Sequence, residues 1–138
     1  MMKSNAFYLL FTLCLLFGAC QSEPQSTSTT TADGTVVRSE KADVTNFAKK
    51  LAATPNAQLI DVRTPQEFNQ GHLDNAVNIN YHDDFFIEKL QKLDREKPLF
   101  VYCQSGGRSG KTCHKLKKMG FKEIYDMEGG YLAWEAKE

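Results

Sequence analysis

The residues of this sequence best suited to chemistry are a cysteine and the glycine-rich loop that follows it, CQSGGRS at 103–109. Gly106 and Gly107 let the backbone curl so that its N–H groups converge, and a helix beginning there adds the positive end of its dipole. Arg108 adds a permanent charge that can hold two oxygens at once. Such a loop binds an anion and stabilises a thiolate, so the pattern favours Cys103 as a nucleophile that needs no neighbouring base.

The two cysteines in the second half of the chain differ in their predicted positions. A buried structural thiol is the commonest role of a free cysteine, but Cys103 closes an apolar run and stands directly before the glycines, which favours catalysis. Cys113 falls with Leu116 and Met119 on the apolar stripe of the following helix, which favours packing. A disulfide between the two cysteines would block the loop and is therefore disfavoured, although it would provide a redox switch.

Alternating strands and helices must position this loop. Apolar runs bounded by turn residues predict strands, and apolar residues at helical spacing predict helices. The predicted strands are 57–62, 76–79, 98–103 and 122–127, and the predicted helices are 44–52, 65–70, 83–93, 109–119 and one within 128–138. This order predicts an α/β fold with a central, mostly parallel sheet and helices on both faces.

Two of the predicted strands end in polar or reactive residues, at the sheet edge where such folds bind their ligands. Cys103 closes one strand, and Asp61 and Arg63 close another. We expect Asp61 and Arg63 to brace the Cys103 loop through hydrogen bonds rather than to react. The helix after Arg63 has a capping-box pattern, with Thr64 as the N-cap and Glu67 three residues later.

The first residues of the chain read as an export signal. One positive charge at Lys3 precedes an apolar run and then small residues, a pattern typical of a secretory signal over 1–19. Its ending, Gly18-Ala19 before Cys20, resembles that of a bacterial lipoprotein. The resemblance implies cleavage before Cys20, a lipid on that cysteine, and a domain anchored to a bacterial membrane on its periplasmic or extracellular face; a plain secreted protein is the alternative.

The segment 20–34 contains no large apolar side chain and is dominated by Ser, Thr and Gln, so we expect a disordered tether. The folded domain is then predicted over 35–138. The chain carries 17 basic and 17 acidic residues, a balance that gives no sign of a nucleic-acid partner. Its three histidines show no metal-ligand spacing with each other or with the cysteines, so we expect no metal. We also expect no other cofactor and a monomeric protein.

Three motifs together resemble the signatures of the rhodanese domain. They are DVRTPQEFNQGHLDNAVNIN at 61–80, the Cys103 loop, and EGGYLAW at 128–134, and the resemblance covers 35–138. It implies a sulfurtransferase that takes a sulfane sulfur from a small anionic donor such as thiosulfate, carries it as a persulfide on Cys103, and passes it to a thiol or to cyanide. By position, the implied substrate-binding residues are Gln104, Ser105, Gly106, Gly107, Arg108 and Ser109.

Two other functions use the same loop. A cysteine phosphatase also needs converging amides and an arginine, but the related cell-cycle phosphatases have a loop one residue longer than 103–108. The unrelated tyrosine phosphatases place histidine directly before the cysteine, where this chain has Tyr102. A module that only carries or binds a persulfide is the non-enzymatic alternative, and retention of Cys103 disfavours pure binding.

Overall fold

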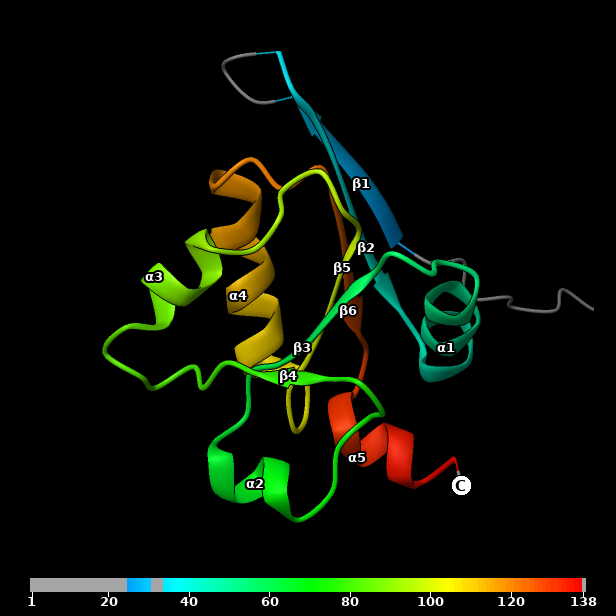
Figure 1. The fold of residues 1–138 in the computed structure, drawn as a ribbon. Helices are drawn as coiled ribbons and strands as arrows, with labels where there is room; N and C mark the ends of the chain where they lie inside the picture. The colour runs from blue at the N-terminus through cyan, green and yellow to red at the C-terminus, as the bar shows by residue number, and fades with distance from the viewer. Residues whose placement is uncertain (1–24, 31–33, 138) are drawn as a thin grey trace, which may run out of the picture.

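A computed structural model describes residues 25–30 and 34–137 (Figure 1). In this part of the chain the strands form one six-stranded sheet in the order β1-β2-β6-β5-β3-β4. The strands are β1 (Gln25–Thr30), β2 (Val36–Ala42), β3 (Gln58–Asp61), β4 (Val77–Asn78), β5 (Leu99–Tyr102) and β6 (Glu123–Met127). All neighbouring pairs are parallel except β1 with β2, which is antiparallel.

Helices cover both faces of the sheet, as the sequence predicts. The helices are α1 (Val44–Ala52), α2 (Pro65–Asn69), α3 (Phe86–Gln91), α4 (Gly107–Lys118) and α5 (Gly130–Glu135). Helices α3 and α4 pack on one face and α1 and α5 on the other, while α2 lies at the edge where the parallel strands end (Figure 1). None of the helices in the described ranges is long and apolar enough to cross a membrane.

Strand β5 lies inside the sheet, between β6 and β3, and its composition explains that place. Its four residues, LFVY, are all buried. A strand that is apolar on both sides is stable only where helices cover both faces of the sheet. The carboxyl end of β5 therefore delivers Cys103 to the middle of the functional edge.

Helix α2 begins as the sequence predicts. The Thr64 side chain accepts from the Glu67 N–H, and the Glu67 carboxylate accepts from the Thr64 N–H at 2.9 Å. Pro65 follows at the first helical position, where its missing N–H costs nothing. This reciprocal cap fixes the first turn of a helix of only five residues.

The N-terminal part of the described chain corrects one prediction. Gln25–Thr30 form β1, so the expected disordered tether is wrong for these residues, and the fold begins before residue 35. Pairing with β2 uses main-chain hydrogen bonds, which Ser and Thr supply as well as apolar residues do. Strand β2 was not predicted either, because it buries the polar side chains of Ser39 and Glu40 among its apolar positions. The predicted signal over 1–19 and the lipidation site Cys20 lie outside the described residues.

Candidate active site

Cys103 lies at the junction between β5 and α4, with its side chain turned into the loop. It is 1% exposed. The N–H of Gly106 donates to Sγ at 3.1 Å, and the Ser109 hydroxyl lies 3.6 Å from the same sulfur. Gly106 has a φ of 98°, a left-handed conformation that favours glycine. The loop therefore gives the sulfur polar partners from both its backbone and its side chains.

The remaining loop residues differ in exposure. Ser105 and Gly107 are exposed, Gln104 and Arg108 are half-buried, and Ser109 is fully buried. Of the predicted substrate-binding residues, the structure places Gly106 and Ser109 against Cys103 Sγ, and the others belong to the same continuous loop. Which of them contact a substrate stays a prediction.

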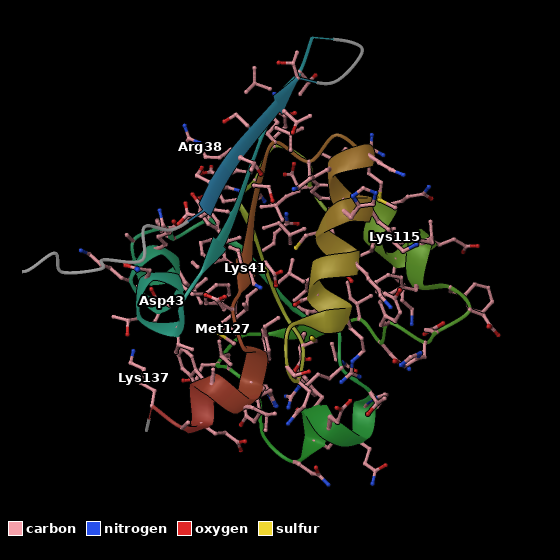
Figure 2. The ribbon with its side chains drawn as sticks, turned by 180° about the vertical axis from the view of Figure 1, so that it is seen from behind. Arg38, Lys41, Asp43, Lys115, Met127 and Lys137 are labelled. Atoms are coloured by element: carbon pink, nitrogen blue, oxygen red, sulfur yellow. The ribbon has the colours of Figure 1, made fainter. Side chains whose placement is uncertain are left out.

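The start of α5 holds the loop from outside. β6 ends at Met127, close to the start of α5 (Figure 2). From there the N–H of Tyr131 donates to the Cys103 carbonyl at 2.8 Å, and the N–H of Leu132 donates to the Gln104 carbonyl at 3.0 Å. Because the C=O and N–H of a trans peptide point in opposite directions, these bonds turn the following loop amides away from α5. The EGGYLAW motif thus sets the direction of the loop amides.

Gly130 makes this close approach possible. Its φ is 62°, and an added Cβ would meet the Cys103 carbonyl and lie 2.7 Å from the carbonyl carbon of Gln104. No side chain fits there without displacing the loop. This glycine is therefore part of the site although it carries no reactive group.

Asp61 and Arg63 form a buried pair directly behind the loop. The Arg63 guanidinium donates to Asp61 at 2.7 and 2.9 Å, and these residues are 1% and 0% exposed, respectively. Its third nitrogen donates to Gln104 Oε1 at 3.1 Å, and its face lies 4.0 Å from the Tyr131 ring centre. The structure places the pair where the sequence expected bracing residues, and their effect on catalysis stays a prediction.

Glu67 is a site residue that the sequence indicated only as a helix cap. Its carboxylate accepts two hydrogen bonds from Arg108, at 2.7 and 2.8 Å. These hydrogen bonds hold the pKa of Glu67 at about 2, against the opposing effect of burial. The guanidinium of Arg108 therefore faces α2, where the Glu67 carboxylate balances its charge, and the anion-binding role expected from the sequence stays a prediction. The capping-box pattern at Thr64 and Glu67 predicts the helix cap but gives no signal that Glu67 also pairs with Arg108.

Asp126 is a second residue that sequence reasoning missed. It lies on β6 facing α4 and is 7% exposed. Burial raises its pKa to about 6, while the nearby Ser109 side chain acts in the opposite direction. The only sequence signal was an acidic residue inside the apolar strand EIYDM.

Cys113 lies in the core under α4, as its helical spacing predicted. It is 5% exposed, and burial raises its pKa well above the ordinary value. Cys103 and Cys113 are both free thiols, so they form no disulfide. Among the described residues, no group of three or more His, Cys, Asp or Glu side chains could hold a metal ion.

Comparison with known proteins assigns the fold to a family. The family model for the rhodanese-like domain matches residues 44–137. The chain belongs to the rhodanese-like domain family. This rhodanese-like chain is 41% identical over 81 residues to the uncharacterized protein YqhL of Bacillus subtilis, an alignment that covers 59% of the chain and 63% of YqhL.

A named enzyme and a solved structure are also similar to this rhodanese-like chain. It is 31% identical over 89 residues to the thiosulfate sulfurtransferase GlpE of Shewanella oneidensis, covering 64% of the chain and 86% of GlpE. The crystal structure of a rhodanese-related protein from Thermoplasma volcanium superimposes with a TM-score of 0.62 at 28% identity, covering 70% of the chain and 91% of that protein. The predicted rhodanese fold is confirmed.

Proposed function

We propose that this rhodanese-like domain is a sulfurtransferase that moves sulfane sulfur from a small anionic donor such as thiosulfate to a thiol or cyanide. The observation that carries the proposal is the hydrogen bond that the Gly106 N–H donates to Cys103 Sγ at 3.1 Å. A backbone donor aimed at sulfur stabilises either a thiolate or a persulfide anion. Similarity to proteins named sulfurtransferases supports the same reaction class.

The proposed reaction has two displacements at sulfur. The Cys103 thiolate attacks the outer sulfur of thiosulfate, a new S–S bond forms, and the old S–S bond breaks with its electron pair leaving on sulfite. The acceptor thiolate then attacks the outer sulfur of the Cys103 persulfide, and the Cys103 thiolate is released. Each step is a nucleophilic substitution, and no metal or redox cofactor takes part.

Mass spectrometry of the full chain tests the first displacement. We expect incubation with thiosulfate to add about 32 Da, one sulfur atom, to the Cys103 peptide, as covalent catalysis requires. Cys103→Ser should lose the adduct. Cys113→Ser should keep it, because Cys113 lies in the core. An adduct at Cys113, or no adduct together with turnover of an aryl phosphate, would contradict the proposal and favour the phosphatase.

A second measurement separates an enzyme from a persulfide carrier. An enzyme forms thiocyanate from thiosulfate and cyanide over many cycles, whereas a carrier releases about one sulfur per Cys103 and stops. We expect repeated turnover. A single burst equal to the protein concentration would support the carrier.

We also propose that the chain is exported and anchored through a lipid on Cys20. The support is the sequence of the first twenty residues alone. Expression of the full chain in a bacterium should give a membrane-bound protein whose N-terminal peptide carries a lipid on Cys20. Cys20→Ser should abolish the modification. An unmodified wild-type Cys20 in the soluble fraction would contradict this part of the proposal.

A further inference from the structure

A buried carboxyl group behind the Cys103 loop takes no part in the reaction proposed above. Asp126 is 7% exposed, and its Oδ1 is buried without a hydrogen-bond partner in the described structure. A Cβ added to Gly110 would lie 3.7 Å from Asp126 Oδ2, which places the carboxyl against the first turns of α4. A buried ionisable group with an unpaired oxygen is costly to keep, so its position needs a reason.

Ser109 connects this carboxyl to the reactive sulfur. Its fully buried hydroxyl donates to the Gly106 carbonyl at 3.2 Å and lies 3.6 Å from Cys103 Sγ. It also lies close enough to the Asp126 carboxyl to lower the pKa of that group. A hydroxyl carries one proton, so Ser109 can serve only one of these three acceptors fully at any moment.

We propose that Asp126 is a positioning residue whose protonation state decides whether Ser109 donates to Cys103. A protonated Asp126 donates its own proton to Ser109 Oγ, which leaves the Ser109 O–H free for the sulfur. An ionised Asp126 accepts the Ser109 proton, so the sulfur loses a donor and gains a nearby negative charge. The inference rests on the proposed role of Cys103 as the nucleophile.

The surroundings of Asp126 make both protonation states accessible near neutral pH. A cleft of about 280 Å³ borders the carboxyl between α4 and the outer strands. The charged or titratable groups that line the cleft or act on the carboxyl are Glu40 and Lys41 of β2, Cys113, His114 and Lys117 of α4, and Glu128 after β6. Burial has the largest effect and raises the pKa of Asp126 to about 6, while Lys41 and Lys117 act in the opposite direction.

Alkylation of Cys103 as a function of pH tests the proposal without any sulfur donor. The full chain is treated with iodoacetamide from about pH 5 to about pH 9, a range that spans the change at Asp126, and the rate is read on the Cys103 peptide by mass spectrometry. Asp126→Asn imitates the protonated carboxyl. Because a hydrogen bond to a charged group is strong, we expect this variant to react about three- to tenfold faster at pH 7. The wild-type profile should also show an inflection near pH 6 that the variant lacks.

The matched control is the same substitution in a Ser109→Ala background. Because Ser109 transmits the effect, Asp126→Asn should there change the rate by less than about twofold, the mark of strong coupling between neighbouring residues. Equal acceleration with and without Ser109 would overturn the relay, since the charge would then act directly. An unchanged pH profile in Asp126→Asn would also overturn it.

The backbone amide of Gly106 provides an independent measurement, because it donates to Sγ. Its nitrogen chemical shift should titrate near pH 6 in the wild type and not in Asp126→Asn. A titration that persists in the variant would contradict the proposal. If these profiles behave as expected while thiosulfate leaves no adduct, the sulfurtransferase proposal fails and the Asp126–Ser109 inference stands.

Discussion

Two carboxylates flank the Cys103 loop, and their surroundings drive their proton affinities in opposite directions. Glu67 lies on the α2 side, where two hydrogen bonds from Arg108 hold its pKa at about 2. Asp126 lies on the core side, where burial raises its pKa to about 6. The first is ionised throughout the physiological range, and the second changes its charge close to it. The loop therefore has a permanent ionic tie on one side and a titratable neighbour on the other.

The difference follows from partners rather than from depth alone. A carboxylate in a bidentate pair with arginine keeps its charge at little cost, whereas a carboxylate that loses water and forms no close ion pair is driven toward the neutral form. Asp61 is likewise fully buried, and the Arg63 guanidinium pairs with it. A carboxyl group thus gives rigid support where arginine pairs with it and sensitivity to pH where it is buried without an ion pair.

Gly130→Ala should disturb both sides of the loop at once and have the largest effect. The new methyl group would meet the backbone of Cys103 and Gln104 at a φ of 62°. We expect the free energy of unfolding, measured with urea, to fall by about 3 kcal/mol or more, from steric overlap and backbone strain together. Gly107→Ala is the control, because an added Cβ there meets nothing within 4 Å. Equal losses in the two variants would show that α5 does not hold the loop.

Asp126→Asn should stabilise the protein, and only above acidic pH. The pKa is raised from an ordinary 3.8 to about 6, so the folded state binds the proton more tightly than the unfolded state does. The cost of ionisation is absent below about pH 4, grows up to about pH 6, and is complete above it. At pH 8 we expect a gain of about 2–3 kcal/mol, at 1.36 kcal/mol per pKa unit.

The control for this gain is Asp84→Asn, a change at an exposed aspartate that should alter stability by less than about 0.5 kcal/mol. Urea denaturation at pH 4 and pH 8 measures both variants. A gain in Asp126→Asn that is the same at the two pH values would contradict the assignment of Asp126 as the titrating group.

Glu67→Gln should act with the opposite sign. The pKa of Glu67 is lowered from 4.5 to about 2, so its contribution is complete above about pH 4.5 and is lost as the pH falls toward 2. Glutamine keeps the capping hydrogen bonds with Thr64 but loses the ion pair. With allowance for partial solvent exposure, we expect a loss of about 1–2 kcal/mol at pH 7 and none near pH 2. The exposed Glu88→Gln is the matched control, and a similar loss there would remove the special role of the pair.

Arg108→Lys should have the smallest effect. Lysine keeps the charge opposite Glu67 but cannot form two parallel hydrogen bonds. We expect a loss of about 1 kcal/mol or less in urea denaturation. Arg38→Lys, which alters an exposed ion pair of 3.8 Å with Glu123, should change stability by less still. If Arg108→Lys costs more than Glu67→Gln, Arg108 has a second partner that matters more than Glu67.

The sequence predicted most of the strands and helices from short-range signals. Each of these elements is specified locally: β5 by its apolar run, α2 by its capping box, and the end of α4 by the glycine that follows it. Strands β1 and β2, at one end of the sheet, gave no such signal. Strand β2 interrupts its apolar positions with Ser39 and Glu40, and β1 is built from Gln, Ser and Thr that gain their order from pairing with β2.

The candidate site divides in the same way. The sequence by itself determined the nucleophile candidate and its loop, because Cys103 and residues 104–109 are continuous and glycine permits the tight turn that the loop requires. Only the tertiary structure decided that Glu67 engages Arg108, that α5 holds the loop carbonyls, and that Asp126 reaches Ser109. These contacts join residues far apart in the chain, and their energies depend on burial and on which charges become neighbours. Neither quantity is encoded by spacing along one segment.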